Sequence, residues 1–99
     1  MKKTLQAFYV KHAAAKQALL SWLDETEKSI WETPNDIIAN YPSADIINRK
    51  RVVFNIKGNN FRLVVDVEYN YKKVFVVWLG THAEYDKIDV KIIRYVKNY

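Results

Sequence analysis

The sequence has no cysteine, and among its 99 residues there are only two glycines, two prolines and two histidines. Without cysteine the chain can form neither a disulfide framework nor a thiolate metal site. The two histidines are far apart in the sequence, so a histidine-based zinc site is not expected either. We therefore expect no metal ion and no cofactor. The length suits one modest core, and no linker or repeat interrupts it, which predicts a single domain over residues 1–99.

Long apolar runs are also missing, and none approaches the length that would cross a membrane. The basic start Met1-Lys2-Lys3 is like that of a secretion signal. However, Gln6, Lys11 and His12 interrupt any apolar segment that would have to follow it. We expect a cytoplasmic protein with no membrane partner.

The positive charge is concentrated in the second half of the chain, which has a formal net charge of +5 overall. Residues 1–48 hold 5 Lys and Arg against 6 Asp and Glu, a net of −1, whereas residues 49–99 hold 11 against 5, a net of +6. Such asymmetry favours a polyanionic partner, with nucleic acid as the first candidate. The alternative is a basic surface that serves only solubility.

Apolar residues recur at helical intervals in the first part of the chain and at every second position in the later part. This order predicts an α+β domain. The stretch from Thr4 to Trp31 has apolar residues at helical intervals, with a break near His12–Ala14 that divides it in two. A short helix is expected over Asp36–Asn40, where Tyr41-Pro42 stops it.

The segments "RVVFNIK" and "NFRLVVDVEY" alternate apolar and polar residues, and Gly58-Asn59 between them is suited to a tight hairpin turn. One register matches apolar with apolar and polar with polar positions, and a slip by one residue would mix the two faces. The expected pairs are Ile56 with Phe61, Phe54 with Leu63, Val52 with Val65, Asn55 with Arg62, and Arg51 with Asp66.

A third strand is expected over Lys73–Leu79, after a turn at Tyr69–Lys72. The three strands would form a small antiparallel sheet with the N-terminal helices packed on one face. The opposite face would carry the polar residues of the hairpin, namely Arg51, Asn55, Lys57 and Arg62.

The last segment, Ala83–Tyr99, fits either a helix or an extended chain. Tyr85, Ile88, Ile92 and Tyr95 follow helical spacing, whereas the β-branched residues favour a strand. We expect a short helix.

"GTHAEYDKID", residues 80–89, follows the third strand and includes the capping box Thr81-His82-Ala83-Glu84. On a helix that starts there, His82, Tyr85 and Asp86 would share one face. Asp86 would then orient the imidazole of a proton-transferring histidine. The alternative is a helix start with His82 in solvent. Arg62 likewise suits either a phosphate contact or a cross-strand surface pair with Asn55 or Asp66.

"RVVFNIKGNNFRLVV", followed by an apolar strand and "GTHAEYDKID", closely resembles the HigB toxin family of type II toxin–antitoxin systems, which belongs to the RelE-like superfamily. The resemblance implies a RelE-like α+β fold, and ribosome-dependent cleavage of mRNA in the A site without a metal ion. In the reaction that it implies, the ribose 2′-OH attacks the adjacent phosphate and leaves a 2′,3′-cyclic phosphate and a 5′-OH.

Carried over by position, the resemblance assigns the scissile-phosphate contact to Arg62 and proton transfer to His82. Tyr85 would stack or act as a second proton-transfer group, and Lys57 would stabilise negative charge. Asp86 is expected to orient His82. The RNA contacts are expected from Arg49, Lys50, Arg51, Asn55 and Lys87.

The resemblance also implies a HigA-type helix-turn-helix antitoxin that neutralises the chain, and the ribosome as a second partner. Two other hypotheses use the same fold. One is a non-catalytic module that binds RNA or a protein on its basic sheet, and the other is a toxin-like remnant that only binds an antitoxin.

Overall fold

Helices precede strands along the chain, as predicted, in a computed structural model that describes residues 2–94. The predicted break in the N-terminal helical stretch is present as a short 3-10 turn. In the described part of the chain, no helix is long and apolar enough to cross a bilayer. The elements in chain order are α1 (Lys2–Lys11), η1 (Ala13–Ala15), α2 (Lys16–Lys28), α3 (Pro34–Asn40), β1 (Asp45–Ile46), β2 (Arg51–Ile56), β3 (Phe61–Glu68), β4 (Lys73–Thr81) and α4 (His82–Tyr85).

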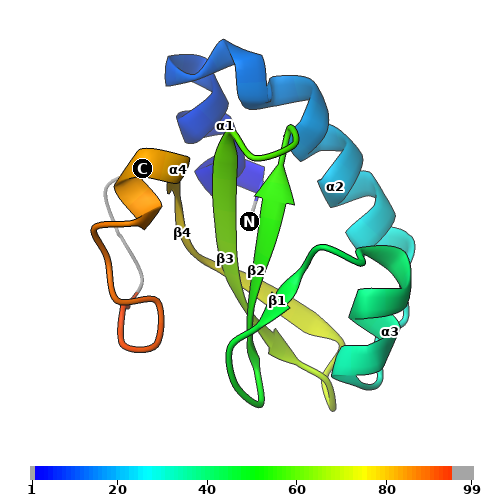
Figure 1. Ribbon diagram of the computed structural model, residues 1–99. Coiled ribbons are helices and arrows are strands. Elements are labelled where there is room, and N and C mark those ends of the chain that lie inside the picture. The colour runs from blue at the N-terminus through cyan, green and yellow to red at the C-terminus, as the bar shows by residue number, and fades with distance from the viewer. Residues whose placement is uncertain (1, 95–99) are drawn as a thin grey trace.

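The strands form an antiparallel sheet in the order β1-β2-β3-β4, so each strand pairs with its neighbour in sequence (Figure 1). The α+β prediction is confirmed. The predicted hairpin register between β2 and β3 is confirmed as well, from Arg51 opposite Asp66 to Ile56 opposite Phe61. β4 extends two residues beyond its predicted end, to Thr81, and β1 was not predicted at all.

The turn between β2 and β3 occupies residues 57–60, and here one prediction is wrong. Lys57 was placed on the polar face of the strand, but β2 ends at Ile56 and Lys57 is exposed in the turn. Its φ is 53° and that of Gly58 is 63°, so both adopt the left-handed backbone that closes tight hairpins. The turn geometry therefore removes Lys57 from the sheet.

The N-terminal helices cover one face of the sheet, as predicted (Figure 1). Apolar side chains at alternate positions of β2 and β3 meet the apolar sides of α1 and α2, where Trp22 packs edge-on against Phe54 at 5.4 Å between ring centroids. Fully buried members of this core include Leu5, Leu19, Trp22, Phe54, Leu63 and Val65.

The other face of the sheet, called here the outer face, carries Arg51, Val53 and Asn55 from β2 and their neighbours on β3. A β-bulge in β4 changes what lies on it. Val65 pairs with Val76 and Val64 with Trp78, which leaves an extra residue between them. As a result Val77 and Trp78 both join the outer-face cluster with Val53 and Val64.

The prediction of a helix over the last segment is wrong beyond Tyr85, where α4 ends after four residues. The chain continues through turns, and Ile88, Val90 and Ile93 pack on the outer-face cluster. Of the residues at helical spacing, Ile88 packs on the sheet whereas Ile92 stays 72% exposed, so contacts with the outer-face cluster decide the path of this segment. Tyr95 and the residues after it lie outside the described part of the chain.

Candidate active site

The predicted capping box forms at the junction of β4 and α4. The hydroxyl of Thr81 accepts a hydrogen bond from the Glu84 N–H at 3.2 Å, and the Glu84 carboxylate accepts one from the Thr81 N–H at 2.8 Å. This N–H bond is the main reason that the pKa of Glu84 lies below its ordinary value. The N–H of His82 donates to the carbonyl of Asn60 at 3.0 Å, so α4 is tied to the β2–β3 turn.

Gly80 has a steric role just before that junction. It lies opposite Arg62, and a Cβ at this position would collide with the indole of Trp78. Because Gly80 has no side chain, the Trp78 indole can lie over β4 at this point. There it packs against Tyr85, with 6.1 Å between the ring centroids. The small residue therefore helps to place Tyr85 beside Arg62.

Arg62 is the centre of the site, because it is a cation that is only 9% exposed. Its Nη1 donates to the carbonyls of Asn59 at 3.1 Å and Phe61 at 3.4 Å, and its guanidinium lies 5.8 Å from the centre of the Tyr85 ring. Within residues 2–94, no carboxylate forms an ion pair with it. A withdrawn cation without a counter-charge favours the binding of an anion.

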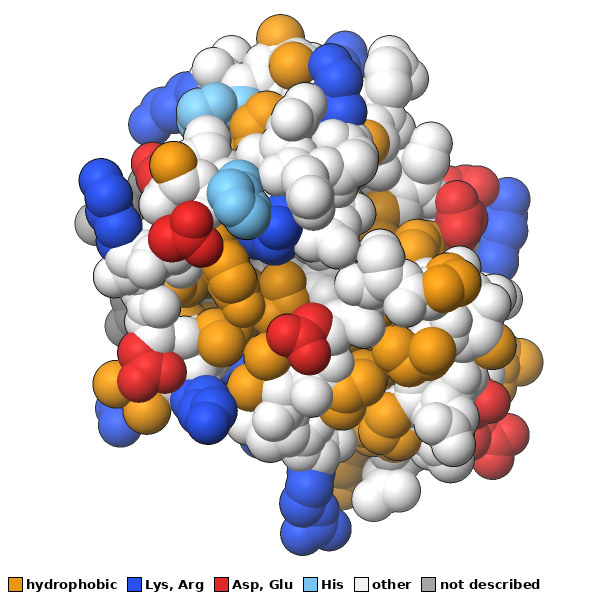
Figure 2. All heavy atoms as spheres, viewed as in Figure 1, with side chains coloured by type: hydrophobic (Ala, Val, Ile, Leu, Met, Phe, Trp, Pro, Cys, Tyr) orange, Lys and Arg blue, Asp and Glu red, His pale blue; other side chains and the backbone are white. Residues whose placement is uncertain are grey.

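A surface groove of about 440 Å³ opens beside Arg62. Its walls come from the segment around β1, from β2 and β3, and from α4. On the face seen in Figure 2, histidine, acidic and basic side chains surround a hollow lined by hydrophobic side chains. The lining residues are Ser43, Ala44, Asp45, Val53, Asn55, Arg62 and Tyr85.

The hydroxyl of Tyr85 is kept protonated by its surroundings. Burial is the largest cause of a pKa raised above the ordinary value of 10, and the charges of Asp45 and Asp86 add to it, while Arg62 acts in the opposite direction. A phenol in this state can donate a proton or a hydrogen bond at neutral pH, but it is not available as a base.

His82 and Asp86 lie one turn apart, as predicted, with 3.7 Å between Nε2 and the nearer carboxylate oxygen. Their side chains are 50% and 65% exposed, so both are accessible from solvent. The distance is longer than a hydrogen bond, and it suits electrostatic orientation of a protonated imidazole rather than a fixed contact.

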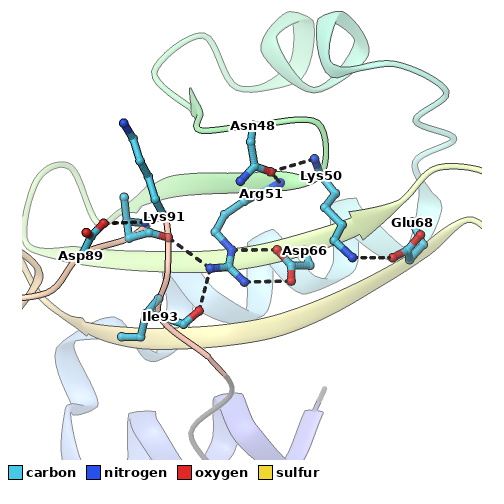
Figure 3. Close-up of polar contacts among 9 residues, drawn as sticks. Asn48, Lys50, Arg51, Asp66, Glu68, Asp89, Lys91 and Ile93 are labelled. Atoms are coloured by element: carbon cyan, nitrogen blue, oxygen red, sulfur yellow. Dashed lines mark hydrogen bonds and ion pairs between the residues drawn. The ribbon is translucent and has the colours of Figure 1, made fainter.

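Arg51, which was predicted to contact RNA, does not line this groove. It lies four residues from Asn55 along β2, a distance of about 13 Å. Its Nε and Nη2 bind both carboxylate oxygens of Asp66 at 2.8 and 3.0 Å. Its Nη1 donates to the carbonyls of Val90 at 3.2 Å and Ile93 at 2.6 Å (Figure 3). Arg51 therefore holds the segment after α4 against the sheet. It shares the predicted face with Asn55 and Arg62, but it does not line the groove beside Arg62.

The remaining predicted RNA contacts are dispersed. Arg49 and Lys50 line a second groove at the far end of the sheet, where Lys50 also pairs with Glu68 at 3.3 Å (Figure 3). Lys87 is exposed just after α4, and its charge contributes to the low pKa of Glu84. The structure thus brings Arg62, Asn55 and Tyr85 together in the groove. The pair His82 and Asp86 lies on the same turn of chain as Tyr85 but does not line the groove, and the other candidates lie elsewhere.

Asp45 is the charged groove residue that sequence reasoning missed. It belongs to β1, a strand of two residues that is too short to show an alternating pattern. Its neighbours Ile46 and Ile47 gave the only hint that the chain pairs with β2 here.

His12 also lies near the site. Its ring stacks on Phe8 with 4.5 Å between centroids and meets Phe61 edge-on, and its charge acts on Glu84. In the described residues, no group of three or more His, Asp or Glu side chains is placed to hold a metal ion.

Comparison with known proteins identifies the same family along most of the chain. Residues 15–88 match the family model described as HigB_toxin, RelE-like toxic component of a toxin-antitoxin system. The mRNA interferase HigB of Escherichia coli O6:H1 is 32% identical over 82 residues, covering 81% of this chain and 77% of that protein. The mRNA interferase toxin HigB of Escherichia coli K12 is 30% identical over 87 residues, covering 86% and 84%.

Proposed function

The chain belongs to the HigB family of RelE-like toxins, and from this premise we propose that it is an endoribonuclease that cleaves mRNA on the translating ribosome. Relatives of similar length bear the name mRNA interferase. The observation that carries the proposal is the withdrawn guanidinium of Arg62, which has no carboxylate partner in residues 2–94 and lies beside Tyr85.

Cleavage of an RNA strand without a metal ion needs three functions, and the site has a group for each. The ribose 2′-OH attacks the adjacent phosphorus, its proton leaves to a base, and the bond from phosphorus to the 5′-oxygen breaks. The products are a 2′,3′-cyclic phosphate and a 5′-OH. The transition state is crowded with negative charge, and its leaving oxygen needs a proton.

Arg62 would stabilise the charge on the phosphate oxygens, because the carbonyls of Asn59 and Phe61 hold its guanidinium in place before RNA arrives. Tyr85 would donate the proton to the leaving 5′-oxygen, since its raised pKa keeps the hydroxyl protonated. His82 would accept the proton of the 2′-OH, and the Asp86 carboxylate at 3.7 Å would stabilise the imidazolium that results.

Other cations would contact the RNA backbone outside the reacting bond. Lys57 belongs to the same turn as Asn59, whose carbonyl binds Arg62, and would meet a phosphate next to the scissile one. Lys87 follows α4, while Arg49 and Lys50 line the groove at the other end of the sheet. Dispersed cations of this kind suit an RNA that crosses the molecule, and binding should weaken with added salt.

Membership of a toxin–antitoxin family implies an antitoxin partner. We propose a HigA-type helix-turn-helix protein in this role. Its complex with the chain would repress the shared operon, and free chain would act on the ribosome.

The test is primer extension on an mRNA under translation in a reconstituted system, with purified wild-type chain, His82→Ala and a reaction without ribosomes. New 5′ ends that require both the ribosome and His82 are expected. His12→Gln is the matched control, because it removes the other imidazole, which packs on Phe8 and has no part in the proposed reaction, and it should cut like the wild type.

Cuts that survive His82→Ala would assign proton transfer to another group and leave His82 as part of a helix start. Cuts on naked RNA would contradict the ribosome requirement. The absence of cuts by a folded chain would favour the second candidate, a non-catalytic RNA-binding module on the same groove.

A further inference from the structure

Asp45 places a carboxylate in a groove that otherwise suits RNA. It lies opposite Val53 in the β1–β2 pair, so its side chain shares the outer face with Val53 and with Asn55, two residues further along β2. Such diagonal neighbours on an antiparallel pair are about 7–8 Å apart. The carboxylate is near enough to Tyr85 for its charge to act on that hydroxyl across the groove.

No hydrogen bond or ion pair engages the Asp45 carboxylate among the residues that the structure describes. A free carboxylate repels phosphate, so this wall of the groove does not suit the RNA backbone. It suits the donor groups of a base. The backbone is then directed to the opposite wall, where Arg62 supplies the positive charge.

Asn55 supplies a second acceptor on the same wall. Its amide nitrogen donates to the carbonyl of Ser43 at 3.2 Å, a contact that only the nitrogen can make. The amide oxygen therefore remains as an acceptor, and no described group donates to it. Val53, whose side chain is buried, forms an apolar floor between the two acceptors.

The four bases differ in what they offer to a pair of acceptors. Guanine presents two adjacent donors on its Watson–Crick edge, the N1–H and the N2 amine. Adenine and cytosine place a ring acceptor next to their amine, and uracil has a single N–H between two carbonyls. Single-stranded RNA is read mainly through these edges, and carboxylates accept hydrogen bonds from the base donors.

We propose that the groove beside Arg62 is a guanine-binding subsite, in which Asp45 accepts hydrogen bonds from the Watson–Crick edge and Asn55 adds an acceptor. The base next to the scissile phosphate would occupy it, so Asp45 determines where the mRNA is cut. This inference rests on the proposed nuclease function and adds base specificity to it. The volume of about 440 Å³ is ample for one base and its ribose.

The first experiment compares messages that differ at one codon, with G, A, C, U or inosine at each codon position in turn, in the reconstituted translation system. The wild-type chain should cut at guanine about ten- to a hundredfold faster than at the other bases. Inosine, which lacks the N2 amine, should lose most of that preference.

Asp45→Asn exchanges one acceptor for a donor with almost no change in shape, so it should reduce the preference for guanine while cleavage elsewhere continues. Asp24→Asn is the matched control, with the same change of charge on the exposed surface of α2, and it should keep the wild-type preference. Cleavage that is indifferent to the base, or a guanine preference that survives Asp45→Asn, would overturn the proposal.

A second experiment does not depend on cleavage. The chain is titrated with 3′-GMP, 3′-IMP and 3′-AMP, and backbone amide resonances are followed by NMR. Shifts at Asp45 and Asn55 should be largest with 3′-GMP and should diminish in Asp45→Asn. Equal shifts with all three nucleotides, or shifts confined to other surfaces, would contradict the subsite. If no message is cut but 3′-GMP binds as expected, the nuclease function fails and the guanine subsite stands.

Discussion

Arg51 and Arg62 lie on the same face of one sheet, and both are largely withdrawn from solvent, but their partners differ. Arg51 is neutralised by two hydrogen bonds to Asp66 and uses its remaining nitrogen to bind the carbonyls of Val90 and Ile93 (Figure 3). Among the described residues, Arg62 donates hydrogen bonds only to the carbonyls of Asn59 in the turn and of Phe61 at the start of β3, and it lies beside Tyr85 in an open groove. The exposed fraction therefore does not distinguish the two arginines, whereas the carboxylate partner of Arg51 does.

The largest expected effect is on stability, at the Arg51 end of the face. Arg51→Ala leaves the buried carboxylate of Asp66 without its partner, which typically costs about 3–5 kcal/mol. Each kcal/mol should lower the melting temperature by about 4–8 °C in a domain of this size. Urea unfolding followed by circular dichroism measures the loss.

The double variant Arg51→Met with Asp66→Leu separates the two causes of that loss. It removes both charges, so it should recover much of the stability, and a double variant as unstable as Arg51→Ala would assign the effect to the lost carbonyl contacts instead.

Substitution of Arg62 should have the opposite effect to substitution of Arg51, with a large loss of activity and little loss of stability. Arg62→Gln removes the charge that stabilises the phosphate oxygens, so cleavage on the ribosome should fall about 10²–10³-fold. Since no described carboxylate depends on Arg62, the free energy of unfolding should stay unchanged or rise. An unfolding midpoint that falls as far as in Arg51→Ala would refute the contrast.

Tyr85→Phe should reduce cleavage about 10²-fold, because it removes the proton donor and keeps the ring beside Trp78. Burial raises the pKa of Tyr85 above its ordinary value of 10. The hydroxyl therefore keeps its proton at neutral pH and loses it at a higher pH than an exposed tyrosine does. Ultraviolet titration of the wild type against Tyr85→Phe should reveal one tyrosine that ionises late. In Asp45→Asn it should ionise at lower pH, since one neighbouring negative charge is gone, and an unshifted titration would contradict this coupling.

The smallest effect concerns the capping box that starts α4. Glu84→Gln removes a negative charge from the first turn and should cost about 0.3–1 kcal/mol at neutral pH. The folded pKa of Glu84 lies below its ordinary 4.5, so the stabilisation is present above that pH and is lost as the pH falls through the lowered value. The wild type and the variant should therefore converge in acid. Thr81→Ala removes the uncharged half of the capping box, so this variant should stay destabilised at neutral pH and in acid.

The hairpin and the start of α4 could be predicted because their signals are local. Alternation in β2 and β3 admits one register that keeps Val52, Phe54 and Ile56 on the same face, and the structure has that register. The capping box needs only Thr81 and Glu84 three residues apart, and it formed as predicted.

The wrong predictions share a different cause, which is competition between a local pattern and a distant surface. Tyr85, Ile88 and Ile92 fit a helix by spacing, but the bulge in β4 presents Val77 and Trp78 as an apolar surface. Ile88, Val90 and Ile93 pack on that surface instead. Arg51 matched Asp66 in the predicted register, yet its further contact with Ile93 spans 42 residues of sequence. Lys57 left the sheet face because the turn demanded a positive φ.

The sequence alone determined the fold class and the strand register, because alternation and capping depend on short stretches of chain. Family resemblance in the same stretches proposed Arg62, His82 and Tyr85 as site residues. Only the tertiary structure decided which arginine lacks a carboxylate, and that Asp45 of a two-residue strand joins the groove. The physical reason is that charge neutralisation and groove formation depend on side chains that meet through space, from elements whose order in the sequence does not specify their contacts.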